Sequence, residues 1–449
     1  MTMSPLQASS ASRSRGRLTS AIALTLAGLS TGAHASMGNI GTTYGLFPAD
    51  IASAQALSMF NSQVSATYYN PAYLAKDSRG ELTTGLLHAE PELRASSPAR
   101  DGDILSDQES QHVLIGMKTN LSSLTRFDHP IYLGFIAGVE KYGKEMLAFE
   151  STTSEDGQFL EYGRQPLFLN IGGATTAWRG IDVGASFRIT LHSTAELSTT
   201  TDLAGNTEYE SLSVNAEPSL RSILSTNIDW GETVCPDSDC WLDGWDTSFA
   251  YRSSSNTNTT VDARTVIPGL IPESAPLVFS VLTYDSYQPS IYAVGVQYST
   301  DSWRVGVTLE QQNWSDLEDE FENDTIKDQA NAKFDDILIP RIGAEFKFAE
   351  HFGLTLGAAY QESALKSNST QDVNYFDNDK YIFGIGLSAE YTRTRLFTYP
   401  IRFDIAYQHQ MLEERDFETD NTAAGARTGE TVTTDGDVDV ISGSVTFKF

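Results

Sequence analysis

Long hydrophobic runs, cysteines and charged side chains are all scarce in this sequence of 449 residues. Beyond position 35 no stretch approaches the ~18 consecutive apolar residues of a membrane-spanning helix, which excludes a helical membrane protein. Charged residues make up 20% of the chain, whereas Ser, Thr, Gly, Asn and Tyr are plentiful. This composition argues against a string of soluble domains, although the length would allow two or three.

Basic residues are especially rare. The formal charge is −29, from 30 basic and 59 acidic residues. A chain so acidic is repelled by phosphate backbones, so nucleic-acid binding is excluded. The seven histidines are scattered, and no spacing typical of a metal or cofactor site is present. We therefore expect no cofactor and no metal.

The first 35 residues read as a cleavable signal peptide. The run from Leu18 to Leu29 is apolar but too short to span a bilayer. Ala33-His34-Ala35 supplies the small-x-small pattern of a cleavage site, which predicts Ser36 as the mature N-terminus. A signal anchor is the alternative, but no stop-transfer pattern follows. The preceding positive region holds three basic residues and no acidic one: Arg13, Arg15 and Arg17.

From about Gly80 onward the dominant signal has a period of two, which is typical of β-strands. In Ile181–His192 the odd positions are apolar and the even positions are polar or small. Trp303–Gln312 and Tyr381–Tyr391 repeat the pattern. A soluble sandwich would also alternate, but here the segments are long and their polar faces are rich in Gly, Ser and Thr. That pattern indicates a transmembrane barrel with a wet interior.

Fourteen such segments predict an all-β, antiparallel, up-and-down transmembrane barrel over residues 80–449. Tight connections such as Arg179-Gly180 alternate with long polar ones, such as 261–287 and 412–436. This alternation is expected of short periplasmic turns and long external loops. An even strand number places both chain ends in the periplasm. The segments are 80–94, 110–120, 131–141, 165–177, 180–197, 209–224, 246–260, 288–298, 303–313, 335–348, 352–361, 380–391, 400–411 and 437–449.

Two further features fit an exported barrel. Cys235 and Cys240 are the only cysteines and lie in a connection that is periplasmic by parity. In an oxidising compartment we expect them to form a disulfide; the alternative, a metal site, lacks two further ligands nearby. The chain ends on Phe449, at the end of an apolar strand face, which resembles the signal read by the barrel assembly machinery. A strand that merely ends in Phe is the alternative.

Residues 36–79 are small, apolar and irregular, unlike the barrel segments. Ile51–Phe60 is Ala-rich and predicts a short helix with Asp50 as its cap. Asn70-Pro71-Ala72 follows, and proline there favours a turn. We expect this segment to fold into the lumen as a plug. The alternative is an unstructured periplasmic tail, which would be more charged.

The ordered set of these motifs resembles the FadL/TodX family of outer-membrane transporters of hydrophobic compounds. Asn70-Pro71-Ala72 is similar to the hatch motif of that family. Gln288–Ser315 resembles its long internal hairpin ending in Trp-Ser, and Ile339–Glu345 its next strand. The resemblance implies a fourteen-stranded barrel closed by an N-terminal hatch, with ligand released sideways near a kinked third strand.

Five residues are named as site candidates on this basis. Gly134 and Gly138 lie in the third segment, where glycine tolerates an inward kink; alternatively they fit the hatch against the wall. Arg188, His192 and Arg341 face inward by parity, and family members that take fatty acids use basic side chains for the carboxylate. Each of the three can equally pair with acids of the lumen.

These observations predict passive transport of long-chain fatty acids or related hydrophobic molecules across the outer membrane, by a monomer surrounded by lipid and lipopolysaccharide. Uptake of aromatic hydrocarbons and export of lipids remain alternatives on the same fold. A general porin would need an open lumen, and an adhesin would use the long loops. Beyond the predicted signal peptide no Gly-x-Ser-x-Gly motif is present, and we expect no enzyme activity.

Overall fold

The computed structural model describes residues 40–98, 109–122, 129–141, 167–201, 207–237, 240–266, 277–321, 333–349, 351–366, 377–392, 398–421 and 428–449. All of them belong to one compact unit. The side chains of 191–217 and 256–286 are not described. The expected signal peptide, residues 1–35, lies outside the described residues.

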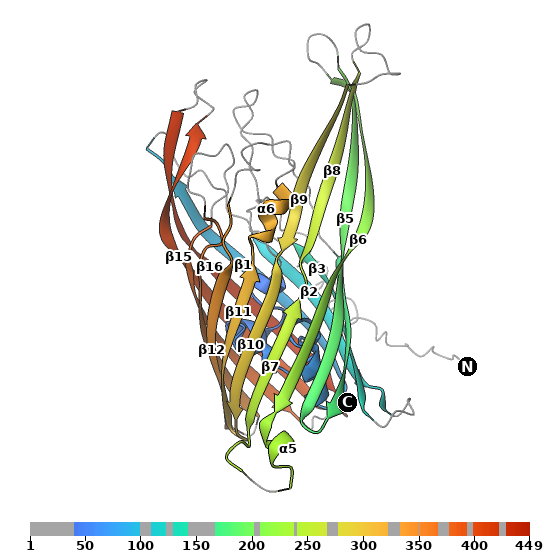
Figure 1. The fold of residues 1–449 in the computed structure, drawn as a ribbon, viewed down its shortest axis with the longest axis vertical. Helices are drawn as coiled ribbons and strands as arrows, with labels where there is room; N and C mark the ends of the chain where they lie inside the picture. Colours follow the sequence, from blue (N-terminus) through green and yellow to red (C-terminus); the bar gives the residue numbers. More distant parts are fainter. Residues whose placement is uncertain are drawn as a thin grey trace, which may run out of the picture. The chain divides into compact units, whose positions relative to one another are not determined.

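A closed ring of fourteen antiparallel strands forms the wall (Figure 1). Each strand pairs with the next along the chain, β7 pairs with β10, and β16 closes the ring on β1. The predicted barrel and its strand number are confirmed. The wall strands are β1 (Glu81–Ser96), β2 (Ser110–Asn120), β3 (Ile131–Lys141), β4 (Leu167–Trp178), β5 (Ile181–Thr201), β6 (Thr207–Asp229), β7 (Trp245–Arg252), β10 (Ser290–Ser299), β11 (Trp303–Asn313), β12 (Ile337–Ala349), β13 (Phe352–Gln361), β14 (Lys380–Tyr391), β15 (Ile401–Asn421) and β16 (Thr428–Lys448).

The connection between β7 and β10 differs from the prediction. The expected seventh strand, 246–260, is interrupted after Arg252, and the expected polar loop 261–287 contains strand instead. Strands β8 (Ser255–Val266) and β9 (Leu277–Gln288) form a hairpin, and β8 runs parallel to the outer part of β5. Pro289, which has no N–H, precedes β10, so the ladder between β7 and β10 ends at the pair Arg252 and Ile291.

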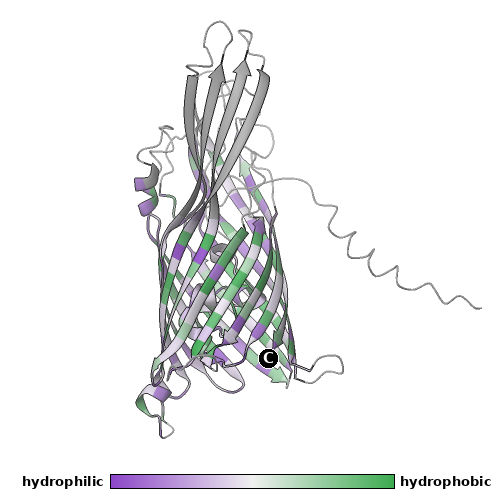
Figure 2. Ribbon diagram, turned by 90° about the vertical axis from the view of Figure 1, so that its right-hand side faces the viewer, coloured by the Kyte–Doolittle hydropathy of each residue, from purple (hydrophilic) through white to green (hydrophobic). Residues whose placement is uncertain are grey.

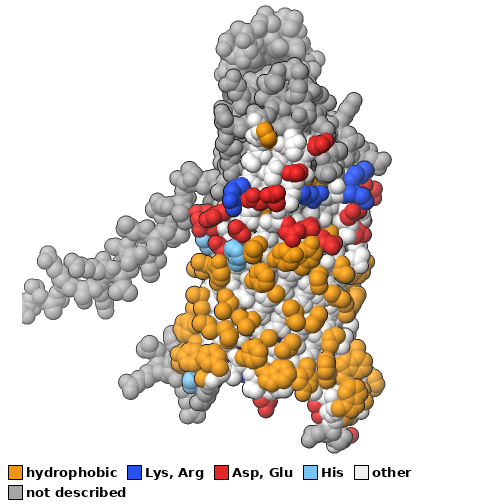
Figure 3. All heavy atoms as spheres, turned by 90° about the vertical axis from the view of Figure 1, so that its left-hand side faces the viewer, with side chains coloured by type: hydrophobic (Ala, Val, Ile, Leu, Met, Phe, Trp, Pro, Cys, Tyr) orange, Lys and Arg blue, Asp and Glu red, His pale blue; other side chains and the backbone are white. Residues whose placement is uncertain are grey.

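The predicted alternation places apolar side chains outward. On β14, Phe383 and Leu387 are exposed. Ile382 lies between exposed Tyr381 and Phe383 and is buried. Figure 2 shows hydrophobic and hydrophilic residues mixed along the wall strands. Figure 3 shows a belt of hydrophobic side chains bounded on one side by acidic and basic ones. Aromatic side chains at the short-turn end include Trp245 and Trp303, both near Tyr298, as in an interfacial girdle.

Helices are short in the described part of the chain, and none of them is long and apolar enough to cross a membrane. Five lie in the N-terminal segment and two in connections between strands. They are α2 (Ile40–Thr43), α3 (Pro48–Ala52), η1 (Ser58–Phe60), α4 (Ala66–Tyr69), η2 (Pro71–Lys76), α5 (Trp230–Val234) and α6 (Asp316–Phe321).

The predicted helix over Ile51–Phe60 is wrong. Helix α3 begins at Pro48, because proline suits the first helical position. Asp50 therefore lies inside the first turn and is not the cap; its carboxylate accepts a hydrogen bond from the N–H of Phe47. The helix cannot continue because Ala54 and Gln55 have φ values of 47° and 65°.

Candidate functional site: a filled barrel lumen and its outer mouth

The segment from Ile40 to Asp77, hereafter the lumen segment, packs against inward-facing side chains of the wall. Most of its residues are buried. Wall side chains on different strands bond to its backbone: Ser186 on β5 to the carbonyl of Thr67 (2.6 Å), and Thr308 on β11 to the carbonyl of Ala56 (2.8 Å). A lumen filled with protein at this level is not the wet interior that the strand pattern predicted.

Asn70, Pro71 and Ala72 connect the lumen segment to β6 and β7. The Asn70 amide donates to the carbonyl of Met59 (2.6 Å) and to Ser248 on β7 (3.1 Å). The N–H of Ala72 donates to Ser225 on β6 (2.8 Å). Pro71 is the first residue of η2, and Asn70 before it has φ −154° and ψ 83°, outside the helical region, as expected before proline. The motif thus fixes a turn against the wall.

Ten wall glycines face the lumen segment. A Cβ added to any of them would lie 2.0–3.0 Å from atoms of that segment, so the two surfaces meet nearly at backbone distance. At Gly357 the nearest atoms are the backbone carbonyl of Ser53, at 2.0 Å. From the sequence, glycines on the inward strand faces were interpreted as part of a polar lining. The strand pattern alone cannot show that the lumen segment packs against them. They are Gly85, Gly116, Gly134, Gly184, Gly295, Gly306, Gly343, Gly357, Gly384 and Gly386.

The ladders from β3 to β2 and β4 continue without a register shift around Gly134 and Gly138. The inward kink expected at these glycines stays a prediction. A Cβ at Gly134 would lie 2.1 Å from the hydroxyl oxygen of Thr67, and one at Gly138 would meet the side chains of Leu114 and Phe168. Gly134 therefore lies in close contact with the lumen segment, as the alternative expected, whereas Gly138 lies against side chains of the neighbouring wall strands.

A buried carboxylate holds the lumen segment together. Asp50 accepts hydrogen bonds from Ser58 (2.8 Å) and Ser65 (3.3 Å) in addition to Phe47. Burial raises the pKa of Asp50 to about 6, and these hydrogen bonds oppose that shift. Asp50 thus titrates close to neutral pH.

Buried arginines surround the lumen segment. Arg188 pairs with Glu140 (3.0 Å) and lies over the ring of Phe168, 4.0 Å from its centroid. Arg341 donates to the carbonyl of Ala54 (3.0 Å) and lies 3.6 Å from Glu310. Two of the three predicted ligand candidates are thus brought to the lumen, each beside a glutamate.

Two further arginines were missed. Arg252 pairs with Glu310, and Arg221 donates to the side chain of Gln288 (3.0 Å) and to the carbonyl of Pro289 (2.8 Å). Arg221 lies directly opposite Arg188 in the β5–β6 register, so inward parity extended to β6 would have found it. The third predicted candidate, His192 on β5, is paired in register with Glu217 on β6. The side chain of His192 is not among those described.

A second apolar region lies at the long-loop end of the barrel. We name it the outer apolar cluster; its aromatic members include Tyr287 and Trp314, whose ring centroids are 5.9 Å apart. It gathers side chains from β9, β12, β15, α6 and the connections between strands, and all of its members are buried. The cluster contains Tyr287, Trp314, Leu317, Phe334, Ile337, Ile339, Ala364, Leu365 and Phe417.

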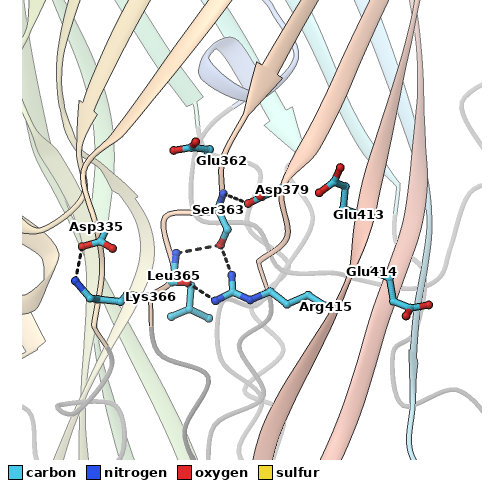
Figure 4. Close-up of a pocket in the computed structure, with 9 residues that line it drawn as sticks. All are labelled: Asp335, Glu362, Ser363, Leu365, Lys366, Asp379, Glu413, Glu414 and Arg415. Carbon is cyan, nitrogen blue, oxygen red and sulfur yellow. Dashed lines mark hydrogen bonds and ion pairs between the residues drawn. The ribbon is translucent and has the colours of Figure 1, made fainter.

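A polar pocket of about 370 Å³ adjoins this cluster (Figure 4). Leu365 belongs to both. Arg415 on β15 donates to the hydroxyl of Ser363 (2.7 Å) and the carbonyl of Leu365 (2.6 Å), and Lys366 pairs with Asp335 (2.9 Å). The bonds of Arg415 hold the connection after β13 against β15, and the Lys366–Asp335 pair joins that connection to the segment before β12. The polar residues of the pocket thus lie next to the outer apolar cluster.

The cysteines are joined as predicted. Cys235 and Cys240 form a disulfide with their Cα atoms 6.3 Å apart. The bond lies at the short-turn end, in the connection that contains α5 (Figure 1). Both sulfur atoms are used in it, which decides between the two alternatives in favour of the disulfide.

Alkane uptake protein A of Marinobacter nauticus is 59% identical to this chain over 436 residues, which cover 96% of the chain and 95% of the relative. The chain belongs to the FadL/TodX family. No protein-family model matches the sequence.

Solved structures of FadL/TodX members share the fold. A Pseudomonas aeruginosa FadL homologue superimposes with a TM-score of 0.59 at 12% identity, covering 93% of this chain and 99% of that one. The toluene transporter TodX of P. putida gives 0.54 at 11% identity, covering 91% and 99%. At such identities the likeness concerns the fold alone.

Membership of the FadL/TodX family decides between the function classes left open by the sequence. This chain is an outer-membrane transporter of hydrophobic molecules and not an enzyme. The packing of the lumen segment inside the ring agrees, because a general porin needs an open aqueous passage. The described residues thus place a buried apolar cluster at the long-loop end and the packed lumen segment behind it.

Proposed function

We propose that this chain takes up long-chain alkanes through the outer membrane. The observation that carries the proposal is the 59% identity, over nearly the whole of both chains, to a protein named for alkane uptake. The outer apolar cluster supports it, because an alkane can be held there only by apolar contact.

The charges of the lumen favour an uncharged solute over a carboxylate. Arg188 is held by Glu140, and Arg252 and Arg341 share Glu310. A fatty-acid carboxylate would have to displace one of these buried partners, and breaking a buried pair is costly. The arginines that the sequence proposed as ligand residues thus act first as supports for the lumen segment.

Fatty acids are the second candidate, and one observation favours them. Four arginines surround two glutamates in this part of the lumen, and each of the four retains a buried N–H group without a protein partner. A buried surplus of positive charge attracts an anion. Arg188 and Arg221 are the side chains that would meet a carboxylate.

The lumen segment acts as a hatch in this proposal. An apolar solute leaves the outer apolar cluster and exits sideways into the hydrocarbon layer, because it gains nothing by crossing water. Such an exit requires wall strands to part or the hatch to shift. We further propose that residues 1–35 are a cleaved signal peptide and that Phe449 directs a monomer to the barrel assembly machinery.

Uptake by cells tests the substrate class. A host without a transporter of its own is given labelled hexadecane, hexadecanoate or toluene, with lipopolysaccharide as the barrier. We expect the chain to raise the initial rate for hexadecane most. Arg221→Met is the matched variant: it should leave hexadecane unchanged and lower hexadecanoate uptake if the second candidate holds. No gain for hexadecane over the empty host would contradict the proposal.

A further inference from the structure

The connection between β6 and β7, residues 230–244, projects from the short-turn end of the barrel (Figure 1). We call it the periplasmic knob. Two other connections at this end, Arg179-Gly180 and 300–302, are tight turns, whereas 121–130 and 392–400 are ten and nine residues long. The knob, at 15 residues, is longer than each of these, although a tight turn is enough to close the wall here.

The knob is ordered by several independent bonds. The Asp229 carboxylate accepts the N–H of Glu232 (3.0 Å) and caps α5. The Asp243 carboxylate accepts the N–H of Cys240 (2.8 Å), beside the disulfide to Cys235. The hydroxyl of Thr233 donates to the carbonyl of Arg179 on the neighbouring turn (3.3 Å). A surface fixed in this way loses little conformational entropy on binding a partner.

Large apolar side chains on the knob face solvent. Trp241 is 82% exposed and Val234 is 56% exposed. By contrast Trp245, at the start of β7, packs beside Tyr298 in the aromatic girdle, with ring centroids 5.2 Å apart. Tryptophan is among the residues that most often carry the energy of protein–protein interfaces. Trp241 thus presents an anchor.

The charged side chains of the knob have one sign. Its described residues include Glu232, Asp237 and Asp243, and its sequence has no lysine or arginine. Such a surface is repelled by a membrane with anionic headgroups and is complementary to a protein surface with basic side chains. The charge therefore favours a protein partner over insertion of the knob into lipid.

The base of the knob is tied to the end of the lumen segment. Lys76, the last residue of η2, lies 2.9 Å from Asp229 and 3.7 Å from Asp246, the carboxylates that flank the knob. It also lies 3.8 Å from Asp182. The hydroxyl of Tyr73 donates to Asp246 (3.3 Å). A partner bound to the knob is thereby adjacent to the anchor of the lumen segment.

We propose that the periplasmic knob is the docking surface for a periplasmic protein that has an apolar pocket for Trp241 and basic side chains around it. Resting on the proposed uptake function, this partner receives the hydrophobic solute on the inner side of the outer membrane. Its pocket takes the indole, its basic rim pairs with the acids of the knob, and its position beside Lys76 places it where the lumen segment ends.

Paired measurements in cells and in outer-membrane vesicles test the docking surface. Trp241→Ala and Glu232→Gln/Asp237→Asn should each lower the initial rate of hexadecane uptake by cells roughly threefold or more, as expected for an interface anchor. The rate into vesicles re-formed from washed outer membranes, from which periplasmic proteins have been removed, should stay at the wild-type value. The control is Trp178→Ala, an exposed tryptophan beside the neighbouring turn, which should change neither rate.

Cross-linking gives a second readout that does not depend on which solute is carried. A photoreactive residue at position 241 should form an adduct in cells that is lost when Glu232 and Asp237 are neutralised; the same residue at 178 should not form that adduct. Wild-type rates in cells, or equal losses in cells and vesicles, would overturn the docking proposal. The docking proposal would also be overturned if the Trp241→Ala variant no longer gave a folded barrel in the membrane. That result would show that Trp241 anchors the barrel in the lipid. Failure of the wild type to carry hexadecane would instead refute the uptake function.

Discussion

The two ends of the lumen are built in opposite ways. At the short-turn end, the lumen segment meets the wall at backbone distance across ten glycines and is tied to it by buried hydrogen bonds and ion pairs. At the long-loop end, apolar side chains cluster beneath a polar pocket. The first arrangement suits a seal and the second suits capture of an apolar solute. A transporter of hydrophobic molecules needs both, because a water-filled passage would not help its cargo.

Removal of the seal should have the largest effect. Deletion of residues 36–76 should leave a folded barrel, because the closed ladder and the lipid-facing side chains stabilise it. Conductance in planar bilayers should rise roughly tenfold, since a ring of this size is close to those that enclose aqueous channels. Unchanged conductance would show that the lumen segment does not close the pore.

A single added side chain should loosen the seal without removing it. Gly357→Val would place its Cβ 2.0 Å from the backbone of Ser53. We expect overpacking to destabilise the closed state by about 1–3 kcal/mol, seen as a lower midpoint of thermal unfolding and more frequent conductance bursts. Gly443→Val is the control, because the nearest atom to its Cβ lies 3.8 Å away. Equal behaviour of the two variants would mean that the close fit is not needed.

The seal should also respond to pH through Asp50. Its pKa is raised by burial from 3.8 to about 6, so the folded segment binds a proton more tightly than the unfolded chain does. The stabilisation is therefore complete below about pH 4 and is lost as pH rises through 6. Amide hydrogen exchange of residues 47–60 should be slower at pH 5 than at pH 7.5, after correction for the intrinsic rate. Asp50→Asn should abolish this difference, and its persistence in that variant would exclude Asp50 as the cause.

The smallest effect should come from the disulfide, which lies outside both regions. The chain-entropy estimate for so short a loop is about 2 kcal/mol at most, and the bond constrains only the knob. Reduction of Cys235–Cys240 should therefore leave conductance and hexadecane entry into vesicles unchanged. It should shift the thermal unfolding midpoint of the barrel little, as followed by heat-modifiable migration. A reduced protein that conducts ions would link the knob to the seal directly.

The wall was predictable because each strand carries its own pattern. The outward face of β14, with Phe383 and Leu387, and the tight turn at Arg179-Gly180 follow from period and turn chemistry alone. The inward direction of Arg188 and Arg341 followed from the same parity. These features depend on a few neighbouring residues, which is why the sequence is enough for them.

What the sequence could not show depends on distant partners. Gly134 reads equally well as a kink or as a close contact until Thr67 is seen opposite it. The break after Arg252 depends on Pro289 across the sheet. The start of α3 is a different case, because Pro48 is a local signal that the alanine-rich run after it obscured. The pairing of Arg252 with Glu310 likewise joins two strands far apart in the chain.

Uptake and conductance measured on the same protein test the central claim most directly. Cells that make the full chain are given labelled hexadecane, and the purified barrel is recorded in planar bilayers. A sealed lumen behind an apolar mouth predicts hexadecane entry well above the empty host, with conductance near the bare-bilayer baseline. Entry no faster than in the empty host, or a large steady conductance from the intact chain, would contradict it.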